Sequence, residues 1–378
     1  MNASLIKKIL SQPSAPFRES HVKNVMMQYL QKNGVKFFED PTGNLILGAS
    51  SQKDYLRLMS QRTHEPLRIF IAHLDHPGFH GVEWLSPTML KIQWHGGSPR
   101  RYLRGANVWI ADSKRSYGVG KLVRAKLVRS GAMLDTGVVE VSTPLKGILA
   151  TELFGGFSFR APVWKEGKIL YTKAADDLVG AYVITALSQK LRSNFLGVLT
   201  RAEEVGFLGA IAHFQLGWWK RAKRPLVAVS LETSRTLPGA EIGQGPVVRL
   251  GDRATCFDPH AIEVLTQVAK KVLGKKFQRR IMDGGTCEGT VTTSLSIPTV
   301  GISVPLGNYH NQSFEGGPDS RGKWGPAPEF VHWDDIRGME RLCEGLLETG
   351  LPWEKPWEKR QFEFEQWIKN YEKLLSLR

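Results

Sequence analysis

Residues 67–75 read LRIFIAHLD. The apolar run LRIFIA (67–72) is followed directly by His73, and Asp75 comes two residues after this histidine. Three later runs have the same short, apolar form: FLGVLT (195–200), LVAVSL (226–231) and TVGISV (299–304). Runs of this length are typical of strands buried on both faces of a parallel sheet. Helical patterns lie between or after these runs, at 178–191, 207–214 and 260–273. The alternation predicts an α/β fold, with a mostly parallel mixed sheet in a three-layer α/β/α arrangement.

The residues before the first run also have local patterns. From Ser20 to Asn33, apolar residues recur at three- and four-residue spacing, which predicts a helix with Ser20 as its N-terminal cap and Gly34 at its end. The stretch VKFFEDPTGNLILG (35–48) then contains two strand-like runs around a turn. We therefore expect a helix and two short strands before the first buried strand.

Between residues 80 and 160 the pattern changes to short alternating segments separated by glycines and turns, such as TMLKIQW and VGKLVRAKLV. Such segments predict a small β-rich, barrel-like domain that is inserted into the α/β domain. We therefore expect a discontinuous catalytic domain, residues 1–79 and 161–350, interrupted by the inserted domain at 80–160.

The remaining residues, 351–378, are expected to form a C-terminal helical extension with the sequence RQFEFEQWIKNYEKLLSL. Five apolar side chains keep a helical spacing along it: Phe362, Phe364, Trp367, Tyr371 and Leu374. A stripe of this kind predicts packing against the rest of the protein rather than a ligand site.

Composition excludes several classes of protein. Hydrophobic residues make up 42% and charged residues 23% of the chain, as in ordinary folded domains and unlike disordered or collagen-like chains. No apolar run approaches the roughly 18–20 residues of a membrane helix, and the N-terminus lacks the pattern of a signal peptide. We therefore expect a cytoplasmic protein with no membrane partner. The three cysteines form no CxxC pair, which argues against disulfides and against a thiolate zinc site.

The formal net charge of +15 is the unusual global value. The lysines and arginines are spread along the chain, and no helix-turn-helix, zinc-finger or RNP-type motif accompanies them. We therefore expect a solvated basic surface and no nucleic-acid partner. A surface of this kind could also attract acidic substrates.

Histidine or carboxylate side chains follow each of the four apolar runs. In chain order these residues are His73, the pair Glu203 and Glu204, Glu232, and His310. Asp176 and Asp177 directly precede a predicted helix. Because ligands bind just outside the carboxyl ends of strands in open α/β sheets, we expect these side chains to meet at one edge of the sheet.

His, Asp and Glu are the ligands expected of a hydrolytic zinc, cobalt or manganese site that has no thiolates. A pair of divalent ions needs a bridging carboxylate and one or two further ligands for each ion. We expect Asp176 to bridge the two ions. His73 and Glu232 would complete one metal, and Glu204 and His310 would complete the other.

Glu203 and Asp75 are expected to support this centre. Neighbouring carboxylates that point in different directions cannot easily bind one ion, so Glu204 would bind metal while Glu203 faces the activated water. Glu203 is therefore the expected general base, which takes a proton from water and passes it to the leaving amine. Asp75, two residues beyond His73, is expected to hold the imidazole by a hydrogen bond and to fix its tautomer.

Each of these residues also has an ordinary explanation when it is taken alone. A histidine after a strand is more often a hydrogen-bonded interior residue, and Asp176 and Asp177 could cap the next helix. Glu203 and Glu204 could lie in the first turn of a helix. The metal-site prediction depends on the combination, in which several strand ends deliver ligands to the same edge.

Several motifs resemble those of the glutamyl/deblocking aminopeptidases, a family of two-metal peptidases that includes the tetrahedral TET aminopeptidases. The motifs are DPTGNLI (40–46), AHLDHPGF (72–79), AADDLVG (174–180), RAEEVGFLGA (201–210) and GNYHN (307–311). The resemblance extends over about residues 8–348. It implies the same five metal ligands, Glu203 as the base, an inserted β-domain, and a homo-oligomer that is either a dimer or a dodecamer-like cage.

The chain departs from the family pattern at three notable positions. Leu178 stands where the family has arginine, Cys287 where it usually has aspartate, and His76 where it has glutamate. None of these departures removes an expected ligand, but they are expected to alter the surroundings of the site and the substrate pocket.

The resemblance implies an aminopeptidase that hydrolyses the N-terminal residue of short peptides. Two alternatives stay open at this point. One is a metal-dependent deacylase or amidohydrolase on the same scaffold, which would cleave N-acyl substrates and spare dipeptides. The other is a catalytically idle, basic protein that binds nucleic acid, for which binding that falls steeply with salt would be the signature.

Overall fold

The four apolar runs lie side by side in one mixed sheet. The structure, a computed structural model, describes residues 1–190 and 193–375. Within these residues the sheet has the order β1–β2–β12–β3–β13–β16–β17–β11–β10, and β14 pairs with both β16 and β15. The strands are β1 (Phe37–Glu39), β2 (Leu45–Leu47), β3 (Leu67–His73), β10 (Val163–Glu166), β11 (Ile169–Thr172), β12 (Phe195–Thr200), β13 (Leu226–Arg235), β14 (Val247–Asp252), β15 (Gln278–Met282), β16 (Thr299–Gly307) and β17 (Glu329–His332).

The centre of this sheet is parallel. β12 and β13 both pair with β3 in parallel, and β16 pairs with β13 in parallel. In this register Thr200 lies beside His73, and Glu232 lies beside Ser303. Every residue of β3, β12 and β16 is buried, as expected for strands covered on both faces. The predicted α/β fold is confirmed.

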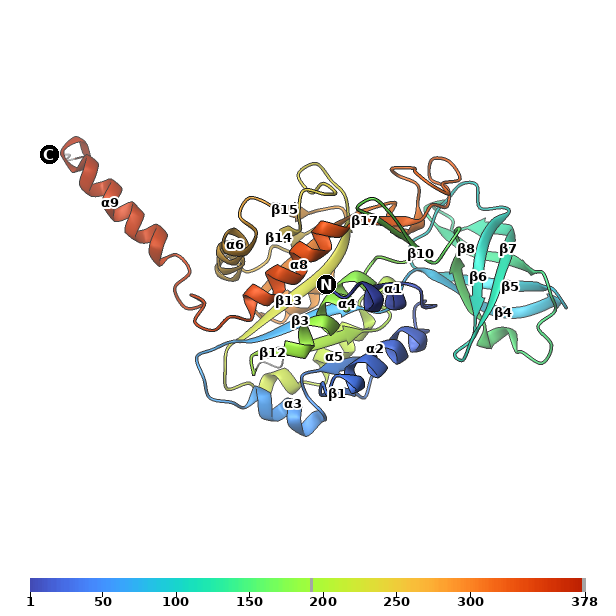
Figure 1. Ribbon diagram of the computed structural model, residues 1–378, viewed down its shortest axis with the longest axis horizontal. Coiled ribbons are helices and arrows are strands. Elements are labelled where there is room, and N and C mark those ends of the chain that lie inside the picture. The colour runs from blue at the N-terminus through green and yellow to red at the C-terminus, as the bar shows by residue number, and fades with distance from the viewer. Residues whose placement is uncertain (191–192, 376–378) are drawn as a thin grey trace.

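Helices cover both faces of the sheet, which gives three layers (Figure 1). One face is covered by α1 (Ala3–Leu10), α2 (Ser20–Lys32), α4 (Leu178–Leu187), α6 (Pro259–Leu273) and α8 (Trp333–Leu346). The other face is covered by α3 (Gln52–Met59), α5 (Leu208–Gln215) and α7 (Gly289–Ser294). The helix expected at 178–191 ends earlier, because a 3-10 turn at Ser188–Lys190 follows α4; residue 191 lies outside the described residues.

The start of α2 differs from the prediction. Ser20 is the first helical residue, and Glu19 occupies the cap position without a capping hydrogen bond from its side chain. The buried Glu19 carboxylate instead accepts hydrogen bonds from the backbone N–H groups of Phe17 and Ala202, at 2.8 and 3.2 Å. Glu19 is therefore used to fix a distant loop rather than to cap its own helix. Gly34, at φ +66°, follows the end of α2 as expected.

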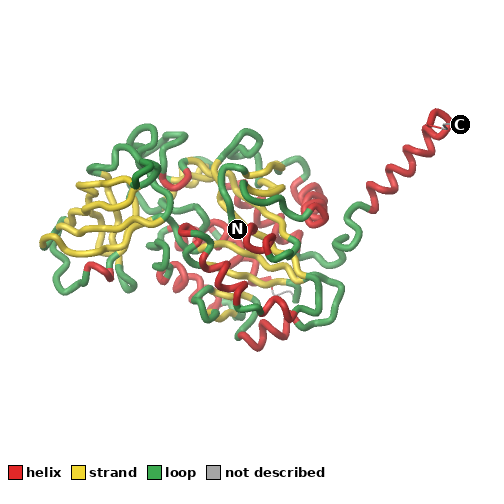
Figure 2. The backbone as a smooth tube through the Cα atoms, turned by 180° about the vertical axis from the view of Figure 1, so that it is seen from behind, coloured by secondary structure: helices red, strands yellow, loops and turns green. Residues whose placement is uncertain are grey.

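The alternating segments form a closed antiparallel barrel, which confirms the barrel-like prediction (Figure 2). Among the described residues its strands have the order β4–β5–β8–β7–β6–β9. Their bounds are β4 (Gly78–Ser86), β5 (Met89–His95), β6 (Ala106–Ala111), β7 (Ser116–Leu127), β8 (Leu134–Val141) and β9 (Phe154–Phe157). The barrel has its own hydrophobic core. Because β4 begins five residues after His73, the barrel is joined to the sheet at the carboxyl end of β3.

The C-terminal helix α9 (Glu358–Leu375) projects away from the rest of the molecule in both views (Figures 1 and 2). None of its described residues is buried. The prediction that its apolar stripe packs against the body is therefore wrong. The body is covered instead by the segment before α9, where Trp353 packs on the main core and Pro356 is buried. Neither α9 nor any other helix within residues 1–190 and 193–375 combines the length and the apolar composition needed to cross a bilayer.

Candidate functional site

The residues expected at strand ends meet at one edge of the sheet. His73 is the last residue of β3, and Glu203 and Glu204 begin a 3-10 turn three residues after β12. Glu232 lies within β13, and His310 lies in a 3-10 turn (Tyr309–Asn311) shortly after β16. These positions follow from the parallel register, because the carboxyl ends of neighbouring parallel strands point the same way.

Asp176, from the loop between β11 and α4, lies between the two histidines. Its Oδ1 atom is 3.4 Å from Nε2 of His73, and its Oδ2 atom is 3.6 Å from Nε2 of His310. The same Nε2 atom of His310 is also 3.1 Å from Oε2 of Glu204. The two oxygens of one carboxylate thus face two separate imidazoles.

Two groups of possible metal ligands share Asp176. One group is Asp176, His73 and Glu232, and the other is Asp176, Glu204 and His310. In each group one ligand atom from every residue lies within 4.8 Å of the others. A further group is formed by His73, Glu203 and Glu204. The five residues expected as ligands therefore lie together, with Asp176 common to the first two groups.

The chemistry of this cluster fits divalent cations. Buried oxygens of Asp176, Glu204 and Glu232 have no hydrogen-bond partner among the described residues. In the described part of the chain, the ion pairs of the clustered carboxylates are made only with His73 and His310. Buried charges and unpaired oxygens of this kind are costly unless a cation compensates them. His and carboxylate ligands without thiolates suit zinc, cobalt or manganese.

The histidines are strongly affected by these carboxylates. Burial alone would lower the pKa of His73, but Glu203, Asp176 and Asp75 outweigh burial and raise the pKa well above its ordinary value. Burial likewise opposes protonation of His310, while Glu204 and Asp176 raise its pKa to about 10. In the absence of other cations, protons on the two imidazoles therefore balance part of the negative charge.

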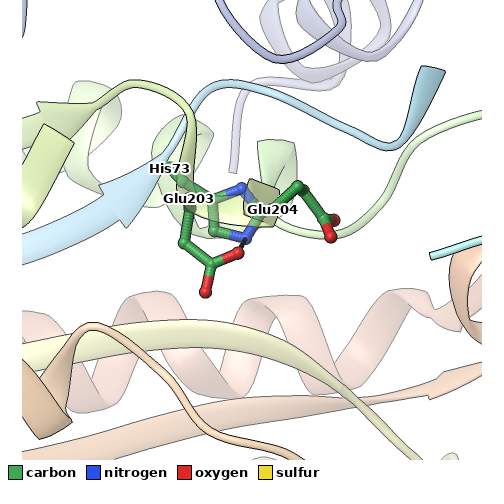
Figure 3. Close-up of side chains that lie close together, drawn as sticks. All are labelled: His73, Glu203 and Glu204. Carbon is green, nitrogen blue, oxygen red and sulfur yellow. Dashed lines mark ion pairs between the residues drawn. The ribbon is translucent and has the colours of Figure 1, made fainter. Parts of the chain in front are cut away.

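Glu203 occupies a different position from its neighbour Glu204. Figure 3 shows its carboxylate beside the imidazole of His73, while the Glu204 carboxylate points away. Oε2 of Glu203 is 3.7 Å from Nε2 of His73. Burial raises the pKa of Glu203 well above the ordinary value, His73 opposes this shift, and Glu204 and Glu232 add to it. Burial beside other carboxylates thus makes Glu203 a stronger proton acceptor than an exposed glutamate.

Asp75 is placed differently from the expectation. Nδ1 of His73 donates to the main-chain carbonyl of Asp75 at 3.1 Å, and the nearest carboxylate oxygen is 3.7 Å away. The carboxylate of Asp75 accepts instead from the backbone N–H groups of Glu203 and Glu204, at 2.9 and 3.1 Å. Asp75 thus orients His73 through its main chain and holds the Glu203–Glu204 turn through its side chain.

Glu329, at the start of β17, is an organising residue that the sequence reasoning missed. Its carboxylate is fully buried and accepts from the backbone N–H groups of Ala175, Asp176 and His310, at 2.6, 3.2 and 2.8 Å. It therefore connects two segments far apart in sequence. A glutamate after a proline carries no local pattern for this role, so only the fold reveals it.

Asp177 is a second residue whose role the motif alone left open. Its Oδ1 accepts from Gly180 N–H at 3.2 Å as the cap of α4, and from the hydroxyl of Thr233 at 2.8 Å. The peptide bond between Asp176 and Asp177 is cis. Asp177 therefore caps the next helix, as its ordinary explanation has it. Its neighbour Asp176 lies in the histidine–carboxylate cluster at the same time.

A pocket opens beside the cluster, on the side of Glu232. Glu232 and the following residues of β13 line it, together with Arg249 from β14, the loop 282–286 and Tyr309. Arg249 is buried. Burial raises the pKa of Glu232, and the positive charge of Arg249 opposes this rise. On the other side, the barrel loop after β5 approaches the cluster, because a Cβ atom at Gly97 would collide with the imidazole of His310.

A mixed α/β sheet with an inserted barrel and a histidine–carboxylate cluster at its strand ends defines a hydrolase scaffold. Residues 154–314 match the M42 glutamyl aminopeptidase family, which confirms the resemblance found in the motifs. The chain is therefore a peptide-bond hydrolase of the aminopeptidase type. No curated protein matches the sequence.

Solved structures share the fold over nearly the whole chain. An aminopeptidase from the archaeon Desulfurococcus kamchatkensis has 21% identity and a TM-score of 0.71, covering 93% of this chain and 95% of its own. The TET1 peptidase of Pyrococcus horikoshii has 20% identity and a TM-score of 0.70, with 92% and 99% covered. An M18-family aminopeptidase from Thermotoga maritima has 12% identity and a TM-score of 0.66, with 92% and 97% covered. At these identities the likeness concerns the fold.

Proposed function

We propose that the protein is a metal-dependent aminopeptidase that removes the N-terminal residue of short peptides. The observation that carries the proposal is the position of Asp176, whose two oxygens face His73 and His310. Asp176 would bridge two divalent ions. His73 and Glu232 would complete one site, and Glu204 and His310 the other. Such a pair of ions polarises a scissile carbonyl and makes water a better nucleophile at neutral pH.

Glu203 would be the general base of this reaction. It takes the proton from the attacking water and returns it to the nitrogen of the leaving peptide, which leaves as an amine. Its raised pKa makes it a better proton acceptor than an exposed glutamate. Asp75 keeps Glu203 in place, because its carboxylate holds the backbone of the Glu203–Glu204 turn.

The substrate would lie between the pocket beside Glu232 and the barrel loop at Gly97. The pocket is lined by β13, β14 and the loop 282–286, so these elements would contact the N-terminal side chain of the peptide. Among the described residues, none from the barrel lines the pocket, and the barrel borders the site on the side of His310 instead.

Glu203→Gln tests the division of roles. The amide cannot accept the proton, so kcat should fall by roughly 10²- to 10⁴-fold while metal content stays unchanged. Metal content is measured by elemental analysis, and turnover by release from aminoacyl-p-nitroanilides with N-acyl compounds as comparison substrates. Loss of metal from Glu203→Gln would contradict the assignment, and cleavage of N-acyl substrates alone would make the protein a deacylase. His73→Ala and His310→Ala should release metal.

We also infer that the chain assembles with copies of itself and that it is divided as the sequence indicated. The structurally similar TET1 peptidase of Pyrococcus horikoshii can assemble into a tetrahedron or a large octahedral shell. The proposed division is a catalytic domain of residues 1–79 and 161–350, a barrel domain of residues 80–160 and the extension 351–378.

A further inference from the structure

The C-terminal helix α9 has an exposed apolar face that nothing in its own chain covers within the described residues. Six large apolar side chains form this face: Phe364, Trp367, Ile368, Tyr371, Leu374 and Leu375. They recur at three- and four-residue spacing, and each is between 48% and 82% exposed. The rings of Phe364 and Trp367 are 5.5 Å apart, which places them on the same side. Phe362 lies on the opposite side, since successive residues turn by about 100°.

The segment before α9 is fixed to the body, so the helix is held outward. The guanidinium of Arg68 lies over the ring of Trp353, 5.1 Å from its centre. The side-chain amide of Gln267, from α6, donates to the carbonyl of Pro356 at 2.8 Å. These contacts fix the segment before α9 and leave the apolar face of the helix exposed.

One edge of the apolar face is acidic. Glu365 and Glu372 border this edge, since each turn of the helix takes about 3.6 residues. At the other edge Arg360, one turn before Phe364, pairs with Glu363 at 3.1 Å. Lys359, Lys369 and Lys373 lie on the far side. An acidic edge beside an apolar face favours a partner surface that is both basic and apolar.

The rest of the chain is strongly basic. α9 contains four basic and four acidic residues, so its net charge is zero and the remainder of the chain carries the whole +15. A groove of about 1030 Å³ on the barrel is lined by five arginines and one acidic residue, Glu140. The arginines are Arg100, Arg101, Arg104, Arg124 and Arg321. Apolar side chains also line the groove, including Leu127 and Tyr102, and Tyr102 is 58% exposed.

Several of these arginines have no acidic partner. Among the described residues, Arg101, Arg104 and Arg124 form no ion pair with a carboxylate. The groove therefore offers unpaired positive charge next to apolar surface, which matches the acidic edge (Glu365 and Glu372) and the apolar face of α9. A helix cannot reach this groove in its own chain, because α9 and the barrel lie at opposite ends of the molecule in both views (Figures 1 and 2).

We propose that α9 of one protomer docks into the arginine-lined groove on the barrel of a second copy of this chain. The contact is head-to-tail, so repeated copies close into a ring or cage when the rotation between neighbours allows it. The apolar face supplies aromatic anchors at the centre of the interface, and the Glu–Arg contacts at its borders select the partner surface. This inference rests on the proposed assembly of identical chains and is independent of the chemistry of the metal cluster.

The apolar part of the contact is tested by the double variant Trp367→Ser/Tyr371→Ser in the full-length protein. Mass is measured by light scattering and sedimentation over a range of protein concentrations. The expected result is dissociation to smaller species, with the dissociation constant raised at least about tenfold. Phe362→Ser is the matched control, because Phe362 is 60% exposed on the opposite side of the same helix, and its mass should match that of the wild type.

The partner surface is tested by reversing charges on each side. Glu365→Arg/Glu372→Arg and Arg101→Glu/Arg124→Glu should each weaken assembly, and the protein carrying all four changes should assemble again. Lys359→Glu/Lys369→Glu, which changes charges away from the face, should leave the mass unchanged. Turnover of a free-amine substrate is recorded in parallel, so that failure of the catalytic proposal is seen separately from failure of assembly.

Three results would overturn the proposal. The first is a wild-type protein that is monomeric at every concentration, including one whose α9 binds vesicles or another protein. The second is an assembly whose mass does not respond to Trp367→Ser/Tyr371→Ser. The third is a fourfold charge-reversed protein that stays dissociated, because the groove would then not be the surface that α9 contacts.

Discussion

Glu329 connects the two sides of the histidine–carboxylate cluster through a single carboxylate. Its oxygens accept from the N–H groups of Ala175 and Asp176 on one side and of His310 on the other. In Glu329→Gln, the amide NH₂ group would face one of these N–H groups instead of accepting from it. We expect a loss of about 1–3 kcal/mol in stability and a weaker metal affinity. Chemical denaturation and metal titration would measure the two effects.

Glu166→Gln is a suitable control for Glu329→Gln, because Glu166 lies exposed on β10 and contacts only surface groups. The same change there should leave metal affinity unchanged. If Glu329→Gln lost stability but bound metal as tightly as the wild type, Glu329 would be a structural residue without influence on the cluster.

His310 should make metal binding strongly dependent on pH. The surrounding carboxylates raise its pKa to about 10, so the metal-free protein holds a proton there throughout the neutral range. A metal must displace that proton, and its apparent affinity should therefore rise with pH by about tenfold per unit for each proton displaced. Titration against a competing chelator at several values between pH 6 and pH 8 measures the slope. In His310→Gln, the slope of the logarithm of metal affinity against pH should fall by about one for the metal that His310 would hold. An unchanged slope would contradict this role.

At the scale of elements, the four apolar runs predicted the sheet and the edge at which the histidine and carboxylate side chains meet. This worked because buried parallel strands need continuous apolar sequence, and their carboxyl ends share one edge. The interactions that were missed join residues far apart in the chain. Glu329 reaches Asp176 and His310 from another strand. The orientation of α9 depends on how Trp353 and Pro356 contact the body, which no periodic pattern encodes.

The loop after β5 places the barrel directly against the histidine–carboxylate cluster. Gly97 lies so close to the imidazole of His310 that a Cβ atom would collide with Nδ1, and the indole N–H of Trp94 donates to the carbonyl of Gly97 at 3.0 Å. Gly97→Ala should therefore displace His310 and lower metal content and turnover, while its Tm in the presence of chelator should stay close to that of the wild type. Elemental analysis and calorimetry would measure the two quantities.

Gly285→Ala provides the comparison for Gly97→Ala. A Cβ atom at Gly285 meets nothing within 4 Å, and the backbone there is not left-handed. Metal content should stay at the wild-type level in this variant. Equal loss of metal from both variants would mean that the close contact between Gly97 and His310 has no special importance.

At the scale of the whole molecule, a chain of net charge +15 buries a cluster of carboxylates where the sheet meets the barrel. Without cations, this negative charge opposes the packing of the layers around it. A ligand that binds only the folded state stabilises it by about 2.7 kcal/mol at a concentration 100-fold above its Kd. Chelation should therefore lower Tm by roughly 3 °C, and added zinc, cobalt or manganese should restore it. Differential scanning calorimetry with and without chelator measures the shift.

The double variant His73→Ala/His310→Ala separates this stabilisation from other effects of the chelator. It lacks one ligand from each of the two groups that share Asp176, so its Tm should be low already and should not respond to chelation. A chelator that lowered the Tm of this variant as much as that of the wild type would act elsewhere. A response confined to the wild type would instead mean that metal binding at this edge contributes to the stability of the whole fold, because the cluster joins β3, β13 and the segment after β16.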